Sequence, residues 1–201
     1  MLCLLMSCGG GSADNAGSGA NDGTKDFSGY TLMDYSADGY QNAKKYHPKD
    51  GFILSEGPLY NNMREGAWMS YHAGRDSGKI KTVTNYHQDV KTGVELEFAT
   101  SGNLSKRVDY DNGQMHGIYA EYKYNRPLKY AEYTKGQLDG AYRTFYSNGK
   151  LQQYSAYKDG KKNGKSIFYN EEEQVIMEYV YENDEKISGG TVTPPPIVKE
   201  K

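Results

Sequence analysis

The sequence predicts an all-β protein, a single-layer antiparallel meander of tandem β-hairpins with about ten strands or slightly more. Of 201 residues, 20 are tyrosine and 24 are glycine, whereas phenylalanine accounts for five and tryptophan for one. Tyrosine favours pleated, half-buried surfaces, because its ring packs while its hydroxyl stays hydrated. A repeat of 23 or 24 residues also runs through most of the chain, and continuous 3.6-residue periodicity, which would indicate helices, is absent.

Four matched positions define five repeat units. The first position is a tyrosine, with spacings of 24, 23, 24 and 24 residues: Tyr86, Tyr110, Tyr133, Tyr157 and Tyr181. A glycine follows each of the first four tyrosines after seven residues, and an earlier unit has Leu59 in the tyrosine place; the glycines are Gly66, Gly93, Gly117, Gly140 and Gly164. Five residues further on stands an aromatic residue: Tyr71, Phe98, Tyr122, Phe145 and Tyr169. Eleven residues after the glycine comes an aliphatic one: Leu104, Leu128, Leu151 and Val175, with Ile80 shifted by an insertion in the first unit.

Each unit is expected to form one hairpin. In the clearest unit, Ala141–Tyr146 and Leu151–Tyr157 are the two strands. Asn148-Gly149 between them predicts a tight turn in which both central residues have positive φ, and Asp159-Gly160 begins a wider turn into the next unit. The positions two and five residues after the glycine differ by three, so their side chains point to opposite faces of the sheet. Aromatic rings are therefore expected on both faces.

The candidate binding residues stand two places after a repeat glycine: Trp68, Tyr119 and Tyr142. Such a ladder most often forms the core of the sheet, but its exposed side could also be a platform for a protein or a glycan. Glu95 and Ser166 occupy the same place in the other units and interrupt the ladder. The platform would therefore centre on Tyr119 and Tyr142.

Sequences that suggest nucleotide or metal chemistry are explained by the repeat. The stretch "DGKKNGKS" (159–166) has three residues between its glycines where a phosphate loop has four, and "SIFY" continues it as a strand rather than a helix. "DYDNG" (109–113) lacks the glycine position and the twelfth-position glutamate of a calcium loop. The histidines show no metal-ligand spacing: His47, His72, His87 and His116. No nucleophile–base pair stands out, so we expect neither an enzyme nor a cofactor.

Charge argues against nucleic acid as a partner. The chain carries 24 Lys and Arg against 26 Asp and Glu. Residues 59–187 hold 18 basic and 18 acidic side chains, so the aromatic residues are not accompanied by the basic excess that single-stranded nucleic acid needs. The local lysines near residue 161 are expected to be solvated.

The first residues resemble a bacterial lipoprotein signal. Leu5-Met6-Ser7-Cys8 is similar to a lipobox, and Cys8 would be the lipidated residue. Residues 1–7 would be the signal-peptide remnant and 8–28 a flexible tether rich in Gly, Ser, Asn and Asp. The resemblance implies a membrane-anchored protein of the cell envelope; without lipidation the location would be cytoplasmic. Residues 29–58 are expected to add a cap or extra hairpin, and 188–201 a Pro-rich disordered tail.

The repeat itself resembles the variant MORN repeat of bacterial proteins. "YDNGQMHGIYAEY", "YTKGQLDGAYRTFYSNGKL" and "YKDGKKNGKSIFY" carry the resemblance, which covers residues 59–187. Several such proteins are antitoxin-like, and arrays of this kind mostly bind other molecules. The resemblance therefore implies a lipid-anchored scaffold that binds a protein partner. A toxin-neutralising antitoxin or immunity protein is the alternative, and a carbohydrate-binding surface lipoprotein is a further one.

Overall fold

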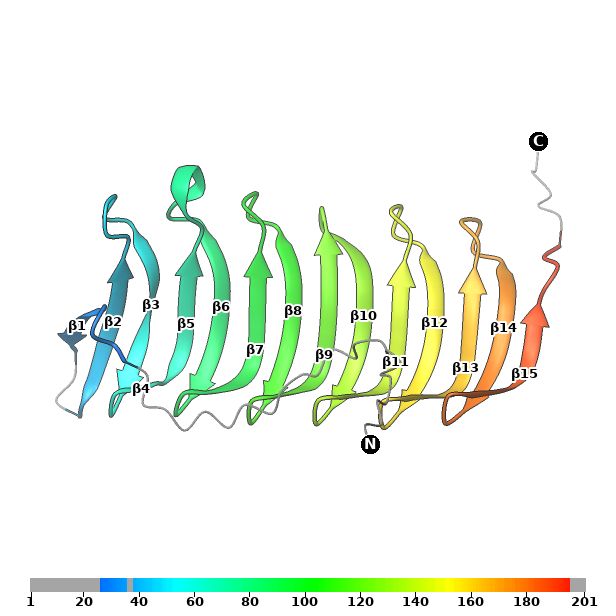
Figure 1. Cartoon of the computed structure of the whole chain (residues 1–201). Coiled ribbons are helices and arrows are strands. Elements are labelled where there is room, and N and C mark those ends of the chain that lie inside the picture. Colours follow the sequence, from blue (N-terminus) through cyan, green and yellow to red (C-terminus); the bar gives the residue numbers. More distant parts are fainter. Residues whose placement is uncertain (1–25, 36–37, 196–201) are drawn as a thin grey trace, which may run out of the picture.

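The computed structural model describes residues 26–35 and 38–195, which form one open antiparallel sheet (Figure 1). This part of the chain holds 15 strands and one short 3₁₀ helix, η1 (Gly74–Asp76). The strands are β1 (Thr31–Asp34), β2 (Tyr40–Tyr46), β3 (Ile53–Tyr60), β4 (Met63–Arg64), β5 (Gly66–Tyr71), β6 (Ile80–His87), β7 (Val90–Phe98), β8 (Leu104–Asp111), β9 (Gln114–Lys123), β10 (Arg126–Thr134), β11 (Gln137–Phe145), β12 (Leu151–Lys158), β13 (Lys161–Tyr169), β14 (Val175–Glu182) and β15 (Glu185–Thr191). The single-layer meander predicted from the sequence is confirmed.

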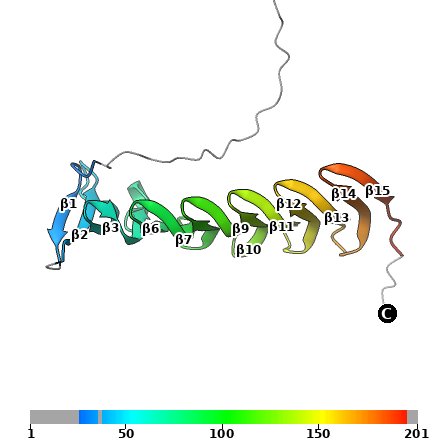
Figure 2. The ribbon, with the colours of Figure 1, turned by 90° about the horizontal axis from the view of Figure 1, so that it is seen from below.

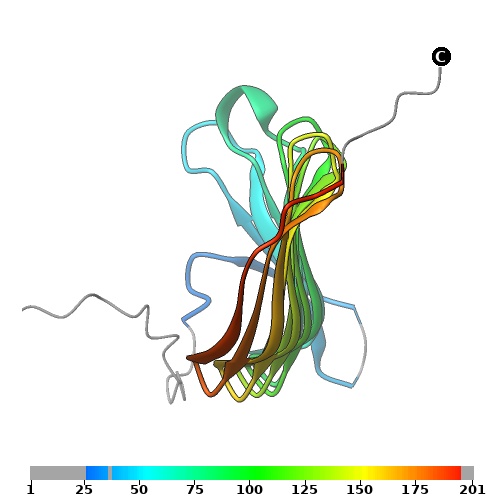
Figure 3. The same ribbon diagram turned by 90° about the vertical axis from the view of Figure 1, so that its right-hand side faces the viewer.

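The order of the strands in the sheet follows their order in the chain. Each strand pairs with the next, except that the two-residue β4 pairs with β3 beside the main path. Figure 2 shows the ribbon as one long layer, and in the end-on view of Figure 3 successive hairpins lie behind one another. The hairpins of the five units are formed by ten strands, β5 to β14. The two-residue β4 also lies within the first unit, and the flanks add β1 to β3 and β15. In the described part of the chain, no helix is long and apolar enough to cross a membrane.

The predicted assignment of tight and wide turns is wrong. Asp159 and Gly160, with φ of 49° and 80°, form the complete two-residue loop between β12 and β13, which is a type I′ geometry. Between β11 and β12 only Gly149 has a positive φ, of 89°, and its N–H donates to the carbonyl of Tyr146 at 2.8 Å. A β-turn followed by a left-handed glycine closes this longer loop, so Asn148 needs no positive φ. Pairs of positive φ recur at Asn61-Asn62, Gln88-Asp89, Asn112-Gly113, Tyr124-Asn125, Lys135-Gly136 and Asn183-Asp184.

The repeat glycines lie at irregularities of the sheet. Their φ angles are 72° at Gly66, 63° at Gly93, 109° at Gly117, 122° at Gly140 and 105° at Gly164. Between β10 and β11, three residues (Asp139 to Ala141) lie opposite the single residue Glu132. The carboxylate of Glu132 accepts the N–H of Ala141 at 2.9 Å, which satisfies a backbone group that the bulge removes from the ladder. The glycines are therefore structural residues that allow the bulge.

The repeat aromatic and aliphatic residues meet across strands, as direct register partners: Tyr71 with Ile80, Phe98 with Leu104, Phe145 with Leu151 and Tyr169 with Val175. In the remaining unit, Tyr122 pairs with Pro127 and Leu128 is the extra residue of a bulge. We call the side of the sheet that carries these aromatic residues the back face. The side that carries Trp68, Tyr119 and Tyr142 is the front face.

The flanks depart from the predicted boundaries. The sequence predicts a flexible tether as far as residue 28, but Phe27 is buried against the sheet, because its ring packs on Trp68. We call residues 26–30 the N-terminal strap. The sequence predicts a disordered tail from residue 188 onward, yet residues 188–191 belong to β15 and pair with β14. Gly189 makes this pairing feasible, since a side chain there would overlap the backbone of Glu178 and Tyr179.

Candidate binding surface

A single row of register partners crosses the front face from β5 to β15. Its members are Trp68, Thr84, Glu95, Val108, Tyr119, Ala131, Tyr142, Ser155, Ser166, Tyr179 and Gly189. The small residues of the row are almost completely buried: Thr84 (6%), Val108 (3%), Ala131 (0%), Ser155 (0%) and Ser166 (1%). A one-layer sheet has no second layer to cover them, so the rings of the same face provide the cover. This row is therefore both the core of the array and the base of its front surface.

The most regular part of this surface is the pair Tyr119 and Tyr142, on either side of Ala131. Both tyrosines are half-buried, whereas Ala131 between them is fully buried. The ammonium of Lys129 lies 5.2 Å from the ring centre of Tyr119 and 5.4 Å from that of Tyr142, a cation–π arrangement with both rings. The geometry places two rings and one cation on a rigid strand framework, with their outer surfaces accessible.

Neighbouring tyrosines of the repeat extend this cluster. Tyr133 lies 6.1 Å from Tyr119, and Tyr157 lies 5.8 Å from Tyr142, measured between ring centres. The hydroxyl of Tyr119 donates to the carboxylate of Glu121 at 2.5 Å. Burial, reinforced by this hydrogen bond, raises the pKa of Tyr119, and burial likewise raises the pKa of Tyr133 and of Tyr157. These phenols therefore stay neutral donors over the physiological pH range.

Two serines follow Tyr142 in the row, and one of them, Ser166, stands two residues after a repeat glycine, where Tyr119 and Tyr142 have their rings. Ser166 donates to Ser155 through their hydroxyl oxygens at 2.9 Å, and Gln153 donates to Ser155 at 3.0 Å. A buried hydroxyl is costly unless it is hydrogen-bonded, and here both are. Ser166, which interrupts the predicted aromatic ladder, thus makes the surface between Tyr142 and Tyr179 polar.

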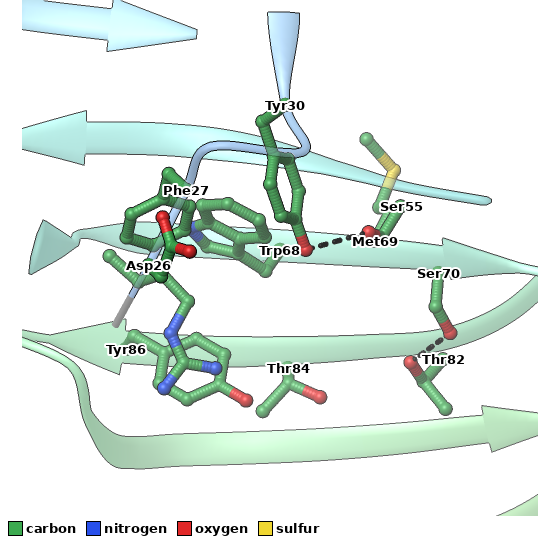
Figure 4. A pocket seen from close by; sticks show the side chains of 11 residues that line it. Asp26, Phe27, Tyr30, Ser55, Trp68, Met69, Ser70, Thr82, Thr84 and Tyr86 are labelled. Atoms are coloured by element: carbon green, nitrogen blue, oxygen red, sulfur yellow. Dashed lines mark hydrogen bonds between the residues drawn. The ribbon is translucent and has the colours of Figure 1, made fainter. Parts of the chain in front are cut away.

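Trp68 does not belong to an exposed platform, contrary to the prediction. Only 6% of its surface is exposed, because the N-terminal strap covers it (Figure 4). The ring centres of Phe27 and Tyr30 lie 5.9 and 6.0 Å from that of Trp68, and the indole N–H donates to the carbonyl of Pro58 at 2.8 Å. The sequence does contain a signal for this covering segment: Phe27 and Tyr30 directly follow the polar stretch of the tether. Two aromatic residues three apart are unusual in a flexible tether.

A small cavity of about 280 Å³ lies between the strap and the sheet. Hydroxyl groups line it, and they are bonded to one another: Tyr30 to Ser55 at 3.3 Å and Ser70 to Thr82 at 2.6 Å. Figure 4 shows these two contacts on one side of the Trp68 ring. The cavity is thus part of the packing that holds the strap.

The other candidate positions are also located. Lys165 and Ser166 of the sequence that resembles a phosphate loop lie in β13, so the strand that the repeat predicts there is confirmed. Cys8 lies outside the described residues. Glu95, which interrupts the ladder, accepts hydrogen bonds from Thr84 at 2.9 Å and from Lys91 at 2.6 Å.

Charge is divided unequally between the two faces of β10–β15, which the sequence analysis missed. All carboxylate-bearing residues of these strands point to the back face: Glu132, Asp139, Glu178, Glu182 and Glu185. The front face of the same strands carries Lys129, Lys162 and Lys186. The equal totals of acidic and basic residues hid this separation, which appears only when each residue is assigned to a face by its register.

The fold and this surface define the class of the protein: a β-hairpin repeat array with two solvent-facing sides. No protein-family model matches the chain, and no curated protein matches it in sequence. The resemblance to MORN-variant repeats therefore stays a prediction.

The buried tyrosines predict a loss of stability at alkaline pH. Burial raises the pKa of Tyr71 to about 12, with a further contribution from Glu56, and burial also raises the pKa of Tyr110 and Tyr119. Because an unfolded tyrosine titrates near pH ~10, the stabilisation is complete below that pH and falls as the pH rises from there through the folded-state pKa values. As the pH is raised, tyrosinate absorbance should therefore increase over the same pH interval in which the β-sheet circular dichroism signal is lost. Gradual ionisation of all tyrosines with an unchanged circular dichroism signal would contradict this.

Proposed function

We propose that this protein is a binding scaffold: its hairpin array recognises a protein partner through the front face, centred on Tyr119 and Tyr142. The observation that carries the proposal is the partly exposed pair of rings over the fully buried Ala131, with Lys129 between them. Tyrosine is enriched where proteins meet, because it supplies a large contact area with few rotatable bonds. The bulged ladder fixes the rings, so little further ordering is needed on binding.

The proposal includes a lipid anchor at Cys8 in the bacterial cell envelope. The lipobox-like sequence before Cys8 supports it, together with a polar segment that reaches to the strap. Multiple acyl chains on one cysteine would hold the array stably at a membrane, where a single chain would bind only reversibly. In this arrangement the repeat array would project from the membrane and present its front face to an envelope or incoming protein.

Site-specific photo-crosslinking in living cells tests this function. A photoreactive phenylalanine analogue in place of Tyr142 is expected to give a discrete protein adduct. The matched control replaces Tyr154, which lies on the adjacent strand β12 but on the back face, where its ring packs against Arg143. In the Cys8→Ser variant the adduct should disappear from the membrane fraction. Adducts of equal yield from both positions, or from neither, would reject the front face as the binding surface.

The identity of the adduct separates the two protein-binding alternatives. A resident envelope protein indicates a scaffold, whereas a toxin indicates an immunity function. The structural support is the same for both, since each requires an exposed surface for a protein partner.

A further inference from the structure

The front face of β10–β15 combines aromatic rings with cations and carries no carboxylate on these described strands. Its large side chains are Tyr133, Leu138, Tyr142, Tyr157, Phe168, Met177, Tyr179 and Tyr181. Its lysines are Lys129, Lys162 and Lys186. Arg126 lies on the same face at the start of β10, since its register pair with Lys123 is next to the back-face pair of Pro127 and Tyr122. We call this surface the basic aromatic face.

The three lysines lie against rings instead of against acids. The ammonium of Lys162 lies 5.0 Å from the ring centre of Tyr181, and that of Lys186 lies 5.2 Å from the ring centre of Tyr179. Among the described residues, no carboxylate comes within ion-pair distance of either lysine or of Lys129. Their positive charge therefore remains available to a ligand.

The neighbouring half of the same face is different. On β7 to β9 the front-face carboxylates are already engaged: Glu95 with Lys91, Glu97 with Lys106 at 2.6 Å, and Glu121 with the hydroxyl of Tyr119. Front-face cations without a carboxylate partner among the described residues begin at Lys123, the last residue of β9, and continue to β15. With about 4.8 Å between strands, the lysines span roughly 24 Å across five strand intervals. This length matches a polypeptide segment better than a small molecule.

The chain itself shows what such a surface can hold. In the first units the front face is covered by the N-terminal strap, whose sequence is Asp26-Phe27-Ser28-Gly29-Tyr30. The strap lies beside Arg64, whose guanidinium stacks 3.6 Å from the ring centre of Tyr86, and Asp26 and Arg64 line the same cavity.

Arg64 stands two residues before a repeat glycine, as Lys162 does. Its ring partner Tyr86 has the same place in the repeat as Tyr181, the partner of Lys162. Arg64 itself is ion-paired with Asp89 at 2.7 Å, and the carboxylate of Asp26 accepts hydrogen bonds from Ser28. The strap therefore shows that a peptide with two aromatic residues packs on the front face beside a cation–tyrosine pair.

We propose that the basic aromatic face binds an acidic polypeptide segment that carries aromatic side chains. This inference rests on the proposed scaffold function and specifies the chemistry of the partner. Carboxylates of the segment would pair with Lys129, Lys162 and Lys186, while its aromatic side chains would pack between the tyrosine rings as Phe27 and Tyr30 pack on Trp68.

Binding of the purified full-length chain to a random copolymer of glutamate and tyrosine tests the proposal. The front variant is Lys129→Gln, Lys162→Gln, Lys186→Gln. The matched back variant is Lys158→Gln, Lys161→Gln, Lys165→Gln, which removes the same charge from the opposite face of β12 and β13. The front variant should bind the copolymer about tenfold more weakly, and the back variant within about twofold of wild type.

Comparison ligands separate the other classes of partner. Polyglutamate should bind more weakly than the copolymer, because it lacks rings, and a lysine–tyrosine copolymer should not bind. Equal losses in the two variants, or tighter binding to oligothymidylate or phosphatidylglycerol vesicles than to the copolymer, would overturn the proposal. Adducts at Tyr142 that persist in the front variant would count against this inference alone. Copolymer binding without any adduct in cells would count against the scaffold function.

Discussion

Trp68→Ala is expected to lower the free energy of unfolding of the first units by about 3–5 kcal/mol. Trp68 is the most completely covered aromatic side chain of the front-face row, with 6% exposure. Its ring lies so close over Gly57 that a Cβ there would come within 2.5 Å of it, and it supports both Phe27 and Tyr30. Truncation removes this ring, the hydrogen bond to the carbonyl of Pro58 and the surface on which the strap rests.

The loss should be local, because each hairpin of such an array contacts mainly its neighbours. Amide hydrogen exchange should accelerate in β1 to β6 while β11 to β15 keep their protection. Chymotrypsin should cleave after Phe27 and Tyr30 in the variant and not in the wild type. Tyr119→Ala is the matched control at the same place in the repeat, where a half-buried ring contributes about 1 kcal/mol. Uniform loss of protection along the array, or a strap that stays resistant to the protease, would contradict the assignment.

The fold could be predicted because the repeat fixes both the strands and their faces. Tyr71 and Ile80 are five and fourteen residues after Gly66, and despite the insertion they remain cross-strand partners. The same pairing in three further units shows that the spacing of large side chains carries the register information. Because successive side chains along a strand point to alternate faces, Tyr142 and Phe145, which are three residues apart, lie on opposite faces of the sheet.

The rest could not be derived from spacing alone. Asn148-Gly149 is a strong signal for a two-residue turn, but the aromatic and aliphatic residues must face each other, and a longer loop satisfies that pairing. The burial of Trp68 depends on the strap, which lies outside the repeat. Phe27 reaches Trp68 from a position 41 residues earlier in the chain. The basic aromatic face can be recognised only from the register of six successive strands. The amino-acid composition does not reveal it, because acidic residues on one face and basic residues on the other give equal totals.

Gly140→Ala is expected to destabilise the array by roughly 2–4 kcal/mol. Gly140 has φ of 122°, a conformation that L-amino acids rarely adopt. A methyl group there would also overlap the carboxylate of Glu132, which accepts the N–H of Ala141 at 2.9 Å. If the carboxylate moves away, the backbone N–H of Ala141 loses its acceptor. The overlap is then relieved, but a hydrogen bond is lost.

Gly93→Ala is the matched substitution at the same place in the repeat. Its φ of 63° lies in the ordinary left-handed region, and the nearest atom to an added Cβ is 3.9 Å away, so a cost of about 1 kcal/mol is expected. Thermal unfolding and hydrogen exchange of the two variants measure the difference. The double variant Glu132→Ala, Gly140→Ala removes the overlap with the carboxylate and keeps the backbone strain, but it also removes the acceptor of the Ala141 N–H. Compared with Glu132→Ala alone, it therefore measures the backbone strain. If the Gly93 and Gly140 variants lose equal stability, the bulge is held by backbone conformation alone and the Glu132 carboxylate has no part in fixing it.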